Sequence, residues 1–306
     1  MDWTLLFEQL LNGVQLGILL FLLAAGLTVV FGVMDLMNLA HGSLYMIGAF
    51  VAATVAIATG SFLLAMGAAI TAALIIGIIF EVTLLRTLYG RGHLDQVLVT
   101  FGLILVFNEL VRVVWGPEGL EMPLPAFLDS AVNIFGFAYP VYRLVVIGVG
   151  LVTAAFLYLV IAHTRIGMLI RAGASDRTMV GALGVDIKLL FTVVFGLGAA
   201  LAGLAGVMAA PILSVAIGMG EEILILAFVV IVIGGIGSIR GAFVAAILIG
   251  VIDTLGRSFL DDLFKLFLPA NAAETAAPAV SSMLIYILMV AVLFFRPQGL
   301  FPARTG

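Results

Sequence analysis

The sequence LLNGVQLGILLFLLAAGLTVVFGV, residues 10–33, is a long apolar stretch that contains no charged residue. An α-helix needs about 20 apolar residues to cross the hydrocarbon core of a bilayer, so this stretch is long enough to span it. Further apolar stretches follow along the 306-residue chain, in which 64% of the residues are hydrophobic and 10% are charged. Soluble domains are about half apolar and about one quarter charged. The composition therefore predicts an all-α, polytopic transmembrane helical bundle.

The apolar stretches predict nine spans, and eight or ten are also compatible with their lengths. They lie at about 9–33, 39–59, 62–85, 94–114, 141–162, 189–210, 223–237, 241–257 and 281–295. Nine of the 13 Lys and Arg residues fall in four regions that can share one side of the membrane: 86–91, 165–188, 240 and 296–304. Because basic loops stay in the cytoplasm, we expect the amino terminus outside and the carboxyl terminus inside. The whole chain, 1–306, is expected to form a single transmembrane domain.

Two segments are too rich in polar residues and glycine to be ordinary spans, namely 34–48 and 211–222. Non-helical backbone at membrane depth survives where it faces protein or a water-filled cavity, so interrupted helices point to a transport pathway. The alternative is an interfacial turn. Asn38 and His41 are three residues apart and would share a helix face, and Gly42 would let another backbone approach. These three residues are candidates for a pathway or gate, the alternative being a hydrogen-bonded structural histidine.

Small residues recur along one later span, and the other intramembrane charges have neighbours with which to pair. Gly198, Ala202 and Gly206 are four residues apart, and Gly237 and Gly241 repeat the spacing. This pattern favours close helix packing over a binding site. The charged residues have local partners at helical or near-helical spacing, which favours a structural role. The expected pairs are Glu81 with Arg86, Glu109 with Arg112, and Asp253 with Arg257.

A long basic segment, residues 163–188, connects two spans that a few residues could join. Asp176 is placed to cap a short helix over about 176–182, and Gly184 to end it. Such a helix would expose apolar and basic groups. It could dock into the groove of a partner protein or lie on anionic lipid headgroups.

The sequence contains no motif for chemistry of its own. It lacks the Gly-x-x-x-x-Gly-Lys-Ser/Thr phosphate loop, the Gly-x-Ser-x-Gly elbow and the His-Glu-x-x-His zinc motif, and it contains no cysteine. We therefore expect that the chain is not an enzyme and that it holds no cofactor and no metal. The apolar composition disfavours a nucleic-acid partner. Energy for uphill transport would come from ions or from another subunit.

Several blocks resemble the permeases of branched-chain amino acid ABC transporters. The first is NLAHG at 38–42, followed by GAF at 48–50. Further blocks follow in the expected order: RIG at 165–167, RA at 171–172, Asp176, Ala182, GV at 184–185, LAGLAG at 201–206, GGIGS at 234–238, GA at 241–242 and FRPQGLF at 295–301. Within that family the chain resembles the shorter of two permease subunits.

The resemblance implies a bacterial inner-membrane importer with several partners. These are a second homologous permease, two cytoplasmic ATP-binding subunits and an extracytoplasmic substrate-binding protein. It implies that residues 171–184 form the coupling helix that docks on an ATPase, with Arg171, Ala172, Asp176, Arg177, Gly181 and Gly184. Residues 259–280 match no family block, and we expect them to form an outer loop that contacts the delivery protein. The substrate would be a branched-chain or related amino acid, with amides and urea as alternatives. A self-contained secondary transporter or channel is the competing hypothesis.

Overall fold

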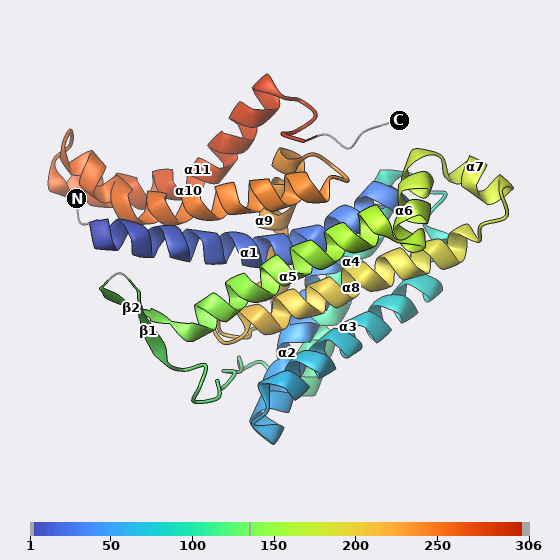
Figure 1. Ribbon diagram of the computed structural model, residues 1–306, viewed down its shortest axis with the longest axis horizontal. Helices are drawn as coiled ribbons and strands as arrows, with labels where there is room; N and C mark the ends of the chain where they lie inside the picture. The colour runs from blue at the N-terminus through green and yellow to red at the C-terminus, as the bar shows by residue number, and fades with distance from the viewer. Residues whose placement is uncertain (1–2, 135, 302–306) are drawn as a thin grey trace.

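The computed structural model describes residues 3–134 and 136–301 and is almost entirely helical. The helices are α1 Trp3–Met34, α2 His41–Thr59, α3 Phe62–Thr83, the 3-10 turn η1 Leu85–Thr87, α4 His93–Trp115, α5 Val141–His163, α6 Arg165–Ser175, α7 Arg177–Ala182, α8 Ile187–Ala209, α9 Met219–Gly234, α10 Ile239–Lys265 and α11 Ala270–Phe295 (Figure 1). Within the described residues, eight helices are long and apolar enough to cross a membrane. The predicted polytopic bundle is confirmed.

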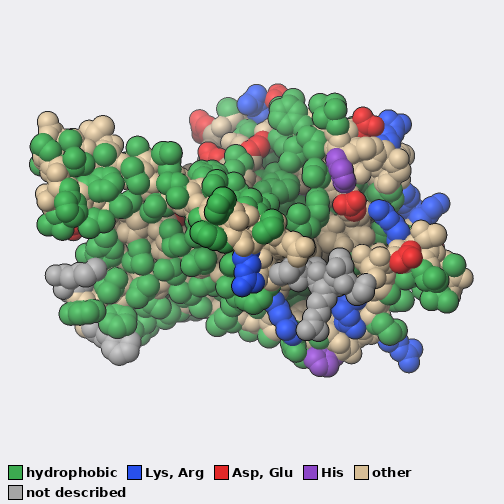
Figure 2. All heavy atoms as spheres, turned by 90° about the horizontal axis from the view of Figure 1, so that it is seen from above, with side chains coloured by type: hydrophobic (Ala, Val, Ile, Leu, Met, Phe, Trp, Pro, Cys, Tyr) green, Lys and Arg blue, Asp and Glu red, His purple; other side chains and the backbone are tan. Residues whose placement is uncertain are grey.

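Helix α1 lies at the centre of the bundle. It is apolar on every side, and 83% of its most apolar 18-residue segment is buried inside the protein. It packs against α10, α8, α5 and α9. A helix that is hydrophobic all round needs such surroundings. Helices α4, α5 and α11 lie at the periphery, where 17%, 22% and 11% of their most apolar 18-residue segments are buried. Figure 2 shows a broad apolar surface, with many of the visible charged side chains gathered towards the end that carries α6 and α7.

Small residues bring α8 close to three other helices. Gly198 packs on α1, Gly203 on α3 and Gly206 on α2, while Ala202 is fully buried between them. A methyl group on Gly203 would lie 2.7 Å from the Cβ atom of Ala73, which is closer than van der Waals contact allows. Any larger side chain on this face would therefore push the helices apart.

The turn before α10 uses glycine in the same way. Gly237 has a φ angle of 78°, and a Cβ atom on Gly32 of α1 would lie 2.7 Å from the Cα atom of Gly237. A Cβ atom on Gly241 would overlap the backbone of Gly234 in α9. The turn therefore packs its backbone directly on α1 and α9.

The two ends of the bundle differ in structure. At one end, strands β1 Ala131–Ile134 and β2 Phe137–Pro140 form an antiparallel hairpin between α4 and α5. The amino-terminal part of α1 lies at this end, where Asn12 accepts a hydrogen bond from Arg143 of α5. The opposite end carries α6, α7, the end of α1 and the segment 300–301, which line a common groove. Arg304 lies outside the described residues.

Two predictions about the later part of the chain are wrong. Residues 259–280 do not form a long outer loop, because α10 continues to Lys265 and α11 begins at Ala270. Lys265 lies 2.5 Å from Asp261 and 3.6 Å from Glu274, so it links the two helix ends. Hydropathy finds only the apolar part of each helix, and here amphipathic and alanine-rich turns extend both. The expected span 223–237 is α9, whose 16 residues give a length of about 24 Å, too short to cross the hydrocarbon core alone.

Candidate functional site

Helices α2 and α9 begin inside the bundle, and their first turns meet. A Cβ atom on Gly42 of α2 would overlap the carbonyl group of Gly220 of α9, and the reverse also holds. The ring of His41 lies against Gly26 in α1, about 12 Å along the helix before α1 ends at Met34. After α1 the chain therefore turns back into the bundle before α2 begins. We call residues 38–43 and 218–222 the helix junction.

The structure confirms that the two segments are interrupted, with narrower limits than predicted. Residues 35–40 are non-helical, whereas 41–48 belong to α2; residues 210–218 form turns, and α9 starts at Met219. Asp35 has a φ angle of 51°, the left-handed region that reverses the chain after α1.

Helix α4 supplies the hydrogen bonds that the re-entrant backbone needs. The N–H of Met37 donates to Gln96 Oε1, and the N–H of Leu39 donates to Thr100 Oγ1, each at 3.2 Å. Both acceptor side chains are buried. Neither residue is among those predicted from the sequence, although their spacing of four on an apolar helix was a usable signal. A non-helical segment at this depth is stable because α4 covers it.

Asn38 and His41 are both fully buried. The prediction that they share a helix face is wrong, because Asn38 precedes the start of α2. Asn38 Oδ1 accepts a hydrogen bond from the N–H of Ala40 at 3.0 Å. Asn38 Nδ2, both ring nitrogens of His41 and the hydroxyl of Thr28 have no hydrogen-bond partner of normal geometry among the described residues. Buried polar atoms are rarely left unpaired. Through Asn38 and His41 the junction therefore holds polar atoms without a normal hydrogen bond to the described residues.

Two carboxylates open α9, where they complement the positive end of the helix dipole. Asn108 Nδ2 of α4 donates to Glu221 Oε1 at 2.5 Å, while Glu222 is exposed. Both glutamates lie at the end of the predicted interrupted segment 211–222, and no role was predicted for either. Their position at the end of that segment was the available signal.

The predicted local pairs are confirmed. The N–O distances are 3.3 Å for Arg86–Glu81, 3.0 Å for Arg112–Glu109 and 2.9 Å for Arg257–Asp253. Glu81 is fully buried and also accepts hydrogen bonds from Thr192, at 2.7 Å, and from Tyr89. Burial and the hydrogen bond to Glu81 raise the pKa of Tyr89 above its usual value. Glu81 thus links α3 to α8, whereas the other two pairs each lie within one helix.

Two short helices occupy the segment 163–188. Thr164 caps α6 by accepting from the N–H of Gly167 at 3.0 Å. Asp176 Oδ1 caps α7 by accepting from the N–H groups of Thr178 and Met179, each at 2.9 Å. Gly184 follows with a φ angle of 87°, in the left-handed region that ends helices. The predicted short helix with its cap and its terminating glycine is present.

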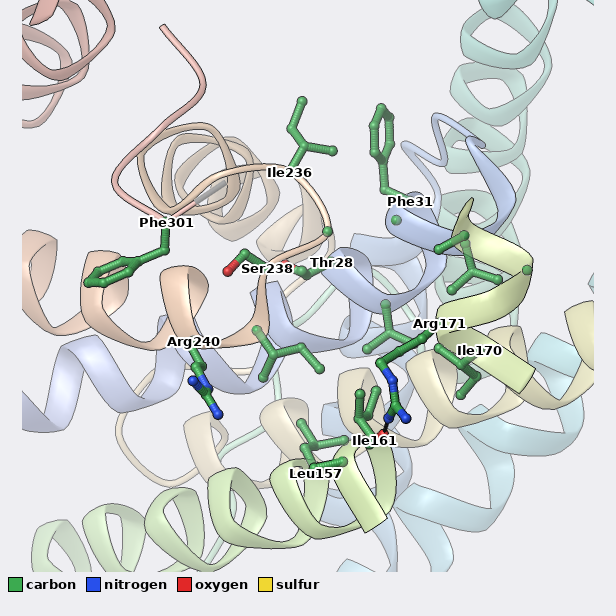
Figure 3. Close-up of a pocket in the computed structure, with 18 of the residues that line it drawn as sticks. Thr28, Phe31, Leu157, Ile161, Ile170, Arg171, Ile236, Ser238, Arg240 and Phe301 are labelled. Atoms are coloured by element: carbon green, nitrogen blue, oxygen red, sulfur yellow. Dashed lines mark hydrogen bonds between the residues drawn. The ribbon is translucent and has the colours of Figure 1, made fainter. Parts of the chain in front are cut away.

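The side chains expected to couple do not all face the same way. Arg177, Gly181 and Gly184 are exposed, and Ala172 is partly buried. Arg171 Nη1 instead donates to the carbonyl oxygen of Ile161, so its guanidinium faces α5 (Figure 3). The outward surface of α7 is thus made by residues near Arg177, including Met179 and Leu183, which are 59% and 77% exposed.

A groove of about 1540 Å³ opens beside α6 and α7. Its walls are α5 and the start of α10, and its floor is the second half of α1 (Figure 3). The segment 300–301 closes one side, where Leu300 and Phe301 donate backbone hydrogen bonds to Ile233 and Gly234 of α9. None of the three pathway candidates, Asn38, His41 and Gly42, lines this groove.

Comparison with known proteins gives one consistent family. Residues 9–293 match the family described as branched-chain amino acid transport system / permease component. The chain is 30% identical to the high-affinity branched-chain amino acid transport system permease protein BraD of Pseudomonas aeruginosa, over 96% of this chain and 94% of BraD. It is 27% identical to LivH of Escherichia coli, over the same shares of the two chains. It is also 27% identical to LivM of Escherichia coli, of which it covers 67%. No solved structure matches the chain.

Proposed function

The chain belongs to the family of branched-chain amino acid transport permease components, and from this we propose that it is the shorter permease subunit of an ATP-driven amino acid importer. The observation that carries the proposal is the family match, which covers residues 9–293 and therefore almost all of the described bundle. The substrate is proposed to be a branched-chain or related amino acid, by analogy with the named substrates of BraD and LivH.

The proposed complex contains a second permease, two cytoplasmic ATP-binding subunits and an extracytoplasmic binding protein. Similarity to both LivH and LivM supports pairing with a homologous permease. The sequence contains no phosphate loop, so ATP would be hydrolysed by partner subunits. The exposed apolar surfaces of α4 and α11 are compatible with contacts to lipid and to a second permease.

We propose that the end of the bundle with α6 and α7 lies in the cytoplasm, which places the amino terminus outside and the carboxyl terminus inside. The concentration of Lys and Arg in the loops at this end supports that orientation. Helix α7 would be the coupling helix, because it presents Met179 and Leu183 beside the charge of Arg177. Apolar side chains flanked by basic ones suit docking into a groove on a partner.

Motion of α7 would reach the helix junction through α8. Asp186 Oδ1 caps α8 at 2.9 Å from the N–H of Lys188, directly after α7. At Gly206 the backbone of α8 then packs directly on the backbone of α2. Closely packed helices move as a unit rather than deforming. A displacement of the coupling helix would therefore shift α2 relative to α9 and open or close the junction.

The junction itself is proposed to line the pathway. Glu222 is exposed where α9 begins, and an exposed carboxylate inside the membrane faces a water-filled path or a partner rather than lipid. It would meet the ammonium group of an amino acid. His41 would act as part of the gate, since its ring nitrogens make no hydrogen bond of normal geometry with the described residues and could accept a transient partner.

Purification of the tagged chain from its native membrane in a mild detergent tests the assignment. We expect a second permease and an ATP-binding subunit to copurify in matching amounts, and uptake of branched-chain amino acids by the reconstituted complex. A chain that purifies alone and transports in liposomes without ATP would refute the proposal and support a self-contained transporter.

Variants at the junction test the pathway assignment. His41→Ala and Glu222→Gln should lower uptake per molecule, whereas Glu109→Gln, which removes a paired surface carboxylate, should not. If His41→Ala lowers only the amount of protein in the membrane, then His41 is a structural residue and the gate proposal fails.

A further inference from the structure

The groove between α5 and α10 brings two arginines to a single turn of α5. Arg171 reaches from α6 and donates to the carbonyl oxygen of Ile161. Arg240 reaches from the start of α10, and its guanidinium carbon lies 5.2 Å from the centre of the Tyr158 ring. Tyr158 and Ile161 are one turn apart on α5, so the two guanidinium groups face the same part of this helix, Arg171 from the α6 side and Arg240 from the α10 side (Figure 3).

Neither guanidinium is neutralised by a residue that the structure describes. Among residues 3–134 and 136–301, no carboxylate lies within ion-pair distance of Arg171 or Arg240. Asp35, Asp176 and a third arginine, Arg177, also line the groove, and neither carboxylate lies within ion-pair distance of Arg171 or Arg240. Asp176 caps α7, and Asp35 lies 4.0 Å from the ring of His93. Each guanidinium has five N–H donors, so most of them remain available to an anion.

Away from the arginines the groove becomes apolar. Its inner part is lined mainly by apolar side chains, with Thr28 of α1 as a polar one: Phe21 and Val29 of α1, Ala154 and Leu157 of α5, and Phe243 of α10. The groove is therefore cationic at the loop end and hydrophobic towards the middle of the bundle. Glu222, the carboxylate proposed to meet the solute, does not line it.

We propose that this groove binds an anionic phospholipid, with its phosphate at Arg171 and Arg240 and an acyl chain along the apolar part. Basic pockets between transmembrane helices on the cytoplasmic side hold lipid headgroups in this way, and the bidentate geometry of arginine suits a phosphate. A soluble partner protein would match the arginines but not the apolar groove that continues into the bundle.

Bound lipid would fix the position of the coupling helix. Arg171 belongs to α6, which leads directly into α7 through the Asp176 cap. A phosphate shared with Arg240 would tie α6 to α5 and α10. The lipid would thus set the resting position from which α7 moves.

The test measures how much phosphatidylglycerol stays bound to the assembled transporter. The complex is reconstituted with phosphatidylglycerol and phosphatidylcholine, extracted in mild detergent, and analysed for retained lipid by mass spectrometry. Two arginines at about 1 kcal/mol each predict on the order of thirtyfold weaker retention of phosphatidylglycerol in Arg171→Gln/Arg240→Gln, with phosphatidylcholine unchanged. Arg165→Gln, which removes an exposed charge of α6 outside the groove, should bind as the unaltered protein does.

A second variant controls for the possibility that the first one loses its structure. Ala154→Phe fills the apolar part while leaving both arginines in place, and it should also release phosphatidylglycerol. Inorganic phosphate and glycerol phosphate should fail to compete at matched concentration. Three results would each overturn the proposal. The first is unchanged phosphatidylglycerol retention in both variants, and the second is full competition by inorganic phosphate alone. The third is an arginine double variant that loses the ATP-binding subunit but keeps its lipid.

Discussion

The helix junction makes a sharp prediction for Gly42→Ala. A Cβ atom on Gly42 would lie 2.8 Å from the carbonyl carbon of Gly220 and still closer to its oxygen. Carbon atoms pack best at about 3.5–4.0 Å, so α2 and α9 must separate by roughly 1 Å. Overpacking of this kind costs about 1–3 kcal/mol. Better helix propensity of alanine offsets at most about 1 kcal/mol of that loss.

We therefore expect a net destabilisation of about 1–2 kcal/mol. In thermal denaturation of the purified complex, followed by the fraction that stays monodisperse, the midpoint should fall by roughly 2–6 °C. Uptake per molecule should fall as well, because the two helix starts no longer touch. Gly148→Ala is the matched control, since a Cβ atom there meets no atom within 4 Å.

A double variant makes the test more specific. Gly220→Ala should be as harmful as Gly42→Ala, and the two together should cost less than their sum, because one separation of the helices accommodates both methyl groups. Strict additivity, or a Gly42→Ala variant that denatures and transports like Gly148→Ala, would refute the proposed contact.

Three further substitutions test other parts of the structure. Asp176→Ala removes the cap of α7, worth about 1 kcal/mol, and should lower the amount of substrate taken up per ATP hydrolysed. Asp262→Ala at the opposite end of the bundle should leave this ratio unchanged. Equal ratios in the two variants would contradict the role of α7. Gln96→Ala leaves a backbone N–H of the re-entrant segment unpaired, at a cost of about 1–3 kcal/mol, and should lower the denaturation midpoint; a stable variant would mean that water replaces the side chain. Asn108→Ala frees the carboxylate of Glu221 and should raise the KM for uptake more than it lowers the amount of protein in the membrane; an unchanged KM would separate this pair from the pathway.

The sequence predicted the features that depend on residues close together in the chain. Hydropathy located the spans, and the i, i+3 and i, i+4 spacing identified the ion pairs of Glu109 and Asp253. The cap at Asp176 and the stop at Gly184 are local chemistry, and both were found.

The features that depend on distant residues were not predictable in the same way. The contact of Gly42 with Gly220 joins two segments that carry no mutual signal, so the sequence indicated interruptions without showing that they meet. The hairpin at 131–140 is too short for a periodic pattern. The groove arises because α5 and α10 both pack on α1, and neither helix alone indicates it.

The meeting of α2 and α9 also has a consequence for how the protein is made. The two helix starts are separated by about 180 residues, which a ribosome takes roughly 10–35 s to synthesise. During that interval α2 is in the membrane without the neighbour against which Gly42 packs. Assembly of the junction is thus a late event in biogenesis. Defects there should appear as nascent chains removed by membrane proteases, as well as slower transport by the chains that survive.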